Sequence, residues 1–76
     1  MTKWHPCKRR DFIRKLKKLG FENPEYGTRH AVMRYSPYKQ VIPSNVEFSV
    51  PQLRVLLRQI EEKLGRKITS EEWDAL

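Results

Sequence analysis

The sequence predicts a small α+β domain in which two helices cover one face of a three-stranded antiparallel sheet. Its 76 residues suffice for a single domain with an economical core. Two segments place apolar residues at helical spacing, and the stretch between them alternates apolar and polar residues as strands do. Only short turns separate the expected strands, so neighbouring strands should pair antiparallel. Both helices have one apolar face, and packing the two against one face of the sheet buries all three apolar surfaces.

The first helix is predicted over residues 8–19, between Pro6 and Gly20, which are residue types typical of helix starts and ends. Its apolar face consists of Phe12, Ile13, Leu16 and Leu19. The opposite face is strongly basic and carries Lys8, Arg9, Arg10, Arg14, Lys15, Lys17 and Lys18. Such a face can contact phosphates, or it can be an ordinary solvated helix surface.

Three strands should follow the first helix. Residues 21–26 form a short strand or extended segment, at the sheet edge because Pro24 cannot donate a ladder hydrogen bond. Gly27-Thr28 marks a turn, and residues 30–35 form the second strand. Ser36-Pro37 marks another turn before the third strand, Tyr38–Ile42, which ends at Pro43.

Alternation divides the second strand into two faces. Ala31, Met33 and Tyr35 should face the core, joined by Val41 from the third strand. The open face of the sheet should then carry His30, Val32 and Arg34.

A loop at 44–48 should lead to the second helix. Ser49 is its expected N-cap, Pro51 lies in its first turn, and Gly65 ends it. Its apolar stripe consists of Leu53, Leu56, Leu57, Ile60 and Leu64.

A short third helix is expected over residues 69–76. Thr69 and Glu72 have the spacing of a capping box, and Ile68 with Trp73 has that of a hydrophobic staple. The whole chain, 1–76, is then one domain, with a flexible tail at 1–7.

Charge restricts the class of partner. Lys and Arg number 16 against 9 acidic residues, a net charge of +7, which favours nucleic acid first and an anionic membrane second. No apolar run approaches the ~20 residues of a membrane span. The single cysteine, Cys7, cannot form an internal disulfide, and the first residues lack the apolar stretch of a signal peptide, so we expect a cytoplasmic protein. His5 and Cys7 alone do not make a zinc site, and we expect no metal and no cofactor.

Several segments together, covering most of the chain, resemble the HicA toxin family, the small ribonuclease partner of HicB antitoxins. The segments that carry the likeness are residues 10–21 with their Leu-Gly-Phe end, Gly27-Thr28-Arg29-His30, Val41-Ile42-Pro43, residues 53–60, and Ile68-Thr69-Ser70-Glu71-Glu72-Trp73. Ser44 and Asn45 stand where many members have a histidine after the third-strand proline.

This resemblance implies a fold similar to a double-stranded RNA-binding domain, an mRNA endonuclease activity, and a HicB-like antitoxin as protein partner. It makes His30 the catalytic residue, with Gly27 and Thr28 as the turn that places it. An imidazole can take a proton from the RNA 2′-OH or deliver one to the leaving oxygen, so the chemistry expected is metal-independent transesterification.

The cations expected to contact RNA near His30 are Arg29, Arg34 and Lys39, which could stabilise charge developing on the phosphorane. On the first helix, the expected RNA contacts are Arg14, Lys15 and Lys18. A second proton-transfer group is not evident; Tyr35 or Tyr38 could serve, or none. Two alternatives stay open: a non-catalytic RNA-binding module, and a domain that chiefly binds a protein.

Overall fold

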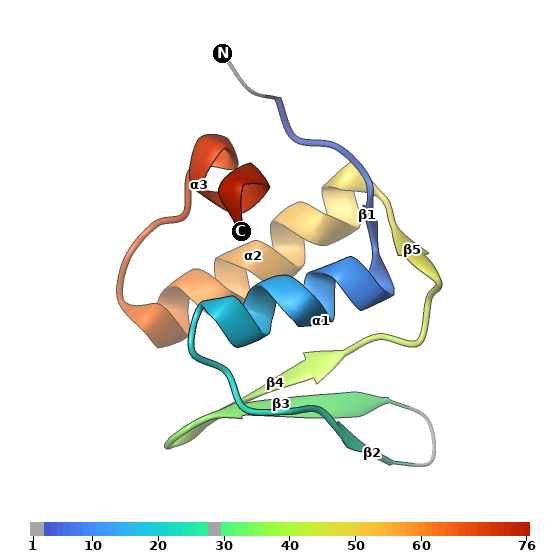
Figure 1. Cartoon of the computed structure of the whole chain (residues 1–76), viewed down its shortest axis with the longest axis vertical. Helices are drawn as coiled ribbons and strands as arrows, with labels where there is room; N and C mark the ends of the chain where they lie inside the picture. The colour runs from blue at the N-terminus through green and yellow to red at the C-terminus, as the bar shows by residue number, and fades with distance from the viewer. Residues whose placement is uncertain (1–2, 28–29) are drawn as a thin grey trace.

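The structure is a computed structural model that describes residues 3–27 and 30–76 (Figure 1). The elements in chain order are β1 (Cys7–Lys8), α1 (Arg9–Lys18), β2 (Glu25–Tyr26), β3 (Ala31–Tyr35), β4 (Tyr38–Ile42), β5 (Glu47–Phe48), α2 (Val50–Leu64) and α3 (Ser70–Ala75). The predicted α+β class, with two long helices, a three-stranded antiparallel sheet and a short C-terminal helix, is confirmed.

The main sheet has the strand order β2-β3-β4, and both neighbouring pairs are antiparallel. In Figure 1, α1 and α2 lie together over one face of this sheet, and α3 lies on the far side of the helices. The other face of the sheet is not covered by any element drawn there. The helix layer therefore separates the sheet from α3.

The register of β3 and β4 corrects one core prediction. Ala31 pairs with Ile42 and Val32 with Val41, so Val41 lies on the outer face and is 50% exposed. The prediction that Val41 faces the core is wrong. Gln40 occupies the inward position instead, opposite Met33, and is 1% exposed. Because the polar Gln40 occupies a core position, the inward and outward faces of β4 are the reverse of those that the sequence indicated.

Gln40 is held inside by hydrogen bonds to its amide nitrogen. Its Nε2 donates to Oε1 of Gln59 on α2 at 2.9 Å and to the Val41 carbonyl at 3.1 Å. Its Oε1 is buried without a hydrogen-bond partner in the part of the chain that the structure describes. The polar contact joins the sheet to α2 but leaves one acceptor unsatisfied, which is costly inside a core.

Among the described residues of the predicted tail 1–7, Cys7 belongs to a β-strand. Cys7 and Lys8 form β1, which pairs antiparallel with β5, a strand that lies inside the expected loop 44–48. Cys7 is buried, and Trp4 packs partly against the core with the Arg54 guanidinium 5.1 Å from its ring centre. Two-residue strands have too little pattern to be read from sequence.

The other elements lie close to their predicted positions. α1 is one residue shorter at each end than 8–19, and the first strand is limited to Glu25–Tyr26, after Pro24. Ser49 caps α2, and Gly65 ends it with a left-handed φ of 75°. At α3, the Thr69 hydroxyl accepts the Glu72 amide hydrogen at 3.1 Å, as the capping box predicts.

The core centres on Phe12 of α1, which is fully buried. Its ring meets Phe48 of β5 edge-on at 5.2 Å and Trp73 of α3 at 5.6 Å. Ile68 and Trp73, the predicted staple pair, are both buried. The short elements at 47–48 and 70–75 are thus integral to the core. Across the described residues, no helix has the length and apolarity that crossing a membrane requires.

Candidate nucleic-acid interface

His30 lies at the tip of the β2–β3 hairpin and is exposed. The Gly27 amide donates to the His30 carbonyl at 3.1 Å, which extends the β2–β3 register beyond Tyr26 and Ala31 by one step. Since Ala31 points inward, alternation puts His30 on the outer face with Val32 and Arg34. The imidazole is therefore on the side of the sheet away from the helices, where a large ligand has access.

Gly27 suits this close approach of the two hairpin arms. A Cβ at position 27 would lie 3.2 Å from the His30 carbonyl oxygen, closer than most such contacts. Glycine is therefore favoured where the hairpin places His30. The other two members of this motif, Thr28 and Arg29, lie outside the described residues.

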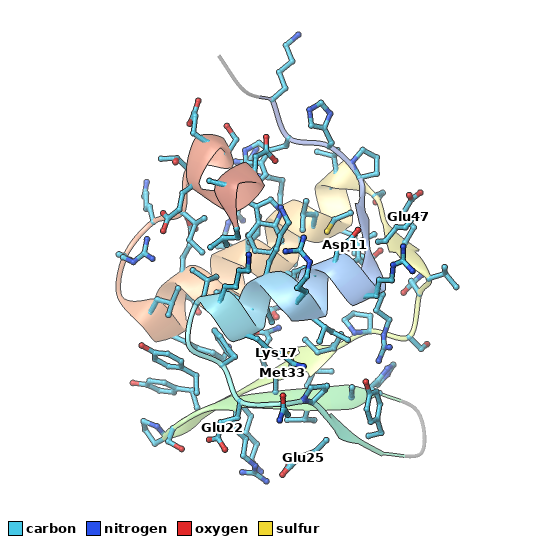
Figure 2. All side chains as sticks on the ribbon, in the orientation of Figure 1. Asp11, Lys17, Glu22, Glu25, Met33 and Glu47 are labelled. Atoms are coloured by element: carbon cyan, nitrogen blue, oxygen red, sulfur yellow. The ribbon has the colours of Figure 1, made fainter. Side chains whose placement is uncertain are left out.

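Arg34 and Lys39 face each other across β3 and β4, at the end of the hairpin away from His30. Four residues along a strand span about 13 Å, so Arg34 does not converge on the imidazole. Its Nε lies 3.0 Å from a Glu25 carboxylate oxygen, in an exposed ion pair. Figure 2 shows Glu25 on the side of the sheet opposite Met33, which points toward the helices. This carboxylate offsets part of the charge that Arg34 would present to a phosphate.

Tyr35 and Tyr38 are also far from His30. They form a cross-strand pair next to the Ser36-Pro37 turn, at the opposite end of β3. Five residues of strand, about 16 Å, separate positions 30 and 35. Neither tyrosine reaches the proton-transfer position beside the imidazole in this arrangement.

The predicted RNA contacts on α1 fall into two groups. Lys15 Nζ donates to the Trp73 carbonyl at 2.7 Å and lies 5.1 Å from the Trp73 ring centre, so it holds α3. Arg14 donates to the Leu76 carbonyl at 3.3 Å and lies 3.9 Å from Asp11. Lys18, in contrast, is exposed. The structure thus directs Lys15 and Arg14 toward α3 and leaves Lys18 open to solvent.

Arg9 and Tyr26 approach the hairpin tip, although the sequence did not single them out as site residues. The Arg9 Nε donates to the Pro43 carbonyl at 2.8 Å, and its guanidinium carbon lies 6.0 Å from the Tyr26 ring centre. Tyr26 is 70% exposed, and its register partner is Ala31, next to His30. The available signal was an aromatic residue directly before the Gly27 turn. Tyr26 was assigned only to the predicted strand 21–26 and was given no role in the site.

A cavity of about 440 Å³ lies where α1 begins. It is lined by Lys8, Arg9, Arg10, Ser44 and Val46. Ser44 and Asn45 directly follow Pro43, at the end of β4. Figure 1 shows this start of α1 on the same side of the molecule as the end of β2 and the start of β3.

Clear pKa shifts occur at Cys7, Arg66 and Glu72. Burial raises the pKa of the Cys7 thiol. A hydrogen bond from Arg66 lowers the pKa of the Glu72 carboxyl, and the same contact raises the pKa of the Arg66 guanidinium. Over residues 3–27 and 30–76, no cluster of three or more His, Cys, Asp or Glu side chains could hold a metal ion.

No protein-family model, curated protein or solved structure matches this chain. The likeness to HicA toxins therefore depends on the quoted sequence segments alone.

Proposed function

We propose that this protein is a toxin-type ribonuclease that cleaves mRNA without a metal ion, using His30 for proton transfer. The observation that carries the proposal is the exposed His30 at a hairpin tip, on the uncovered face of the sheet. A net charge of +7 favours a polyanionic substrate, and Arg9 brings one cation of α1 close to the hairpin.

The proposed reaction uses the nucleophile that RNA itself carries. The neutral imidazole of His30 accepts the proton of the 2′-OH, and the 2′-oxygen attacks the adjacent phosphorus. The bond from phosphorus to the 5′-oxygen breaks, and that oxygen takes a proton from water and leaves as a hydroxyl. The His30 imidazolium then returns its proton to the hydroxide that remains. The products are a 2′,3′-cyclic phosphate and a 5′-OH end.

The proposal includes a HicB-like antitoxin as protein partner and a cytoplasmic location. A protein that covers the hairpin tip would block access to His30, and acidic groups on it would be attracted to the start of α1. The free, buried Cys7 is compatible with a reducing compartment.

Metal-free cleavage of single-stranded RNA tests the catalytic role of His30. Purified protein, His30→Ala and His5→Ala are incubated with the RNA in excess EDTA, and the product ends are identified. The other histidine, His5, is also exposed and serves as the matched control. We expect cleavage by the wild type and His5→Ala, and a loss of at least about 100-fold in His30→Ala. Equal cleavage by all three proteins would remove His30 from the mechanism.

A non-catalytic RNA-binding module is the second candidate, favoured by one observation. Lys17 and Lys18 are exposed on α1, away from the contacts with α3, and can meet phosphates without any reaction. Salt-sensitive RNA binding without cleavage by the wild type would select this function. Absence of salt-sensitive RNA binding would exclude both candidates in favour of a protein-binding domain.

A further inference from the structure

The cavity at the start of α1 has the chemistry of a phosphate site. Of the described residues that line it, Lys8, Arg9 and Arg10 are cations, and Ser44 adds a hydroxyl. No acidic residue lines it; Glu47, opposite Lys8 in the β1–β5 ladder, lines a neighbouring cavity. Cations and hydroxyls that converge on one hollow bind phosphate oxygens by charge-assisted hydrogen bonds.

The backbone around this cavity is held in place by hydrogen bonds. The Arg9 amide donates to the Val46 carbonyl at 2.9 Å, and its side chain donates to the Pro43 carbonyl at 2.8 Å. Lys8, the N-cap of α1, makes no side-chain capping bond. The positive end of the helix dipole therefore adds to the potential of the cations.

Tyr26 extends this site toward the end of the β2–β3 hairpin. Its ring lies 6.0 Å from the guanidinium carbon of Arg9, a residue that lines the cavity, and the ring is largely exposed. Its register neighbour Ala31 is adjacent to His30 in the chain. Since Tyr26 pairs with Ala31, whose side chain points inward, the Tyr26 ring lies on the helix side of the hairpin with the cavity, and His30 lies on the opposite face of the same hairpin end. An exposed aromatic ring beside cations is a platform on which an unpaired base can stack.

We infer that the cavity binds one phosphate of an unpaired RNA strand while Tyr26 stacks on a neighbouring base on the helix side of the hairpin, from where the strand passes around the hairpin end to reach His30. The inference rests on the proposed function and adds to it the substrate class, single-stranded RNA. A base inside a duplex is stacked on its neighbours and cannot offer its face to Tyr26.

Binding of an oligonucleotide that cannot be cleaved tests this inference apart from catalysis. The probe is a fluorescent single-stranded 2′-O-methyl RNA, which lacks the attacking hydroxyl, and affinity is measured by anisotropy at several salt concentrations. The variants are Tyr26→Ser, Tyr26→Phe and Lys8→Gln combined with Arg10→Gln. Lys67→Gln, an exposed cation between α2 and α3, is the matched control.

We expect Tyr26→Ser to bind about 5- to 100-fold more weakly and Tyr26→Phe to bind as the wild type does. The Lys8/Arg10 double variant should lower the slope of log affinity against log salt by about 0.7 for each phosphate that the protein no longer neutralises. Lys67→Gln should change affinity least. Thermal melting of each variant confirms that it is folded.

Wild-type affinity in both Tyr26→Ser and the Lys8/Arg10 variant would overturn the inference, as would equal binding of a duplex of the same length. If the proposed function is wrong, a different measurement shows it, because His30→Ala would then leave RNA cleavage unchanged. Because the probe has no nucleophile, loss of binding and loss of catalysis are read separately.

Discussion

Replacing Lys15 with methionine should destabilise the domain, whereas the same change at Lys18 should not. The Lys15 ammonium donates to the Trp73 carbonyl at 2.7 Å and lies 5.1 Å from the Trp73 ring centre. A hydrogen bond from a charged group contributes about 1.5–3 kcal/mol, and a cation–π contact at an exposed site about 0.5–1 kcal/mol. Lys15 is partly exposed, so the lower ends apply, which together give about 2 kcal/mol.

A loss of about 2 kcal/mol lowers the melting temperature of a domain this size by about 8–16 °C. Methionine keeps the unbranched apolar stem, so the comparison isolates the ammonium group. Lys18→Met should stay within about 0.5 kcal/mol of the wild type. Circular dichroism melts of the two variants measure the difference directly.

RNA binding should respond to the same two substitutions in the opposite order, with the larger effect at Lys18. Lys18→Met should reduce the salt dependence of affinity if Lys18 meets a phosphate, while Lys15→Met should not, because its ammonium is occupied by α3. Equal melting temperatures for the two variants would refute the assignment of Lys15 to α3.

Two further predictions concern buried groups. Gln40→Met removes the unsatisfied Oε1 and frees the exposed Gln59 to bond with water. The free energy of unfolding, measured by urea titration, should therefore be unchanged or rise by up to about 1 kcal/mol. A loss above about 1 kcal/mol would mean that the Gln40–Gln59 hydrogen bond stabilises the fold by more than the buried oxygen destabilises it. Burial raises the pKa of the Cys7 thiol. The stability contributed by the neutral thiol is therefore present below the usual thiol pKa and falls as pH rises past it. In thermal melts from about pH 7 to 10, Cys7→Ala should lose less stability than the wild type. Identical pH profiles for the two proteins would contradict this assignment.

Apolar periodicity and capping chemistry were sufficient to predict the helices. The stripe from Leu53 to Ile60, the Ser49 and Thr69 caps and the Gly65 terminus are local signals, and each recurs in the structure. The pairing of β1 with β5 joins two residues from each of two distant segments, so no local pattern announces it. Gln40 misled the strand prediction because its amide is stabilised by Gln59, a partner on another element.

The candidate site likewise combines features that local sequence signals predict with features that depend on tertiary contacts. His30 was marked by a local motif, and alternation was enough to put it on the open face. The assignment of Lys15 to α3 and the approach of Arg9 to Tyr26 depend on tertiary contacts. A helical face of seven cations looks uniform in sequence, yet packing gives its members different roles.

The contact between α1 and α3 has a consequence for how the chain acquires its structure during synthesis. Lys15 and Trp73 are 58 positions apart, and Arg14 and Leu76 are 62 apart. Phe12, at the centre of the core, meets Trp73 as well. A ribosome makes α1 before the Trp73 segment, and the apolar face of α1 cannot be fully covered until that segment has emerged. Until then α1 remains incompletely buried, and its exposed apolar surface invites chaperones or aggregation.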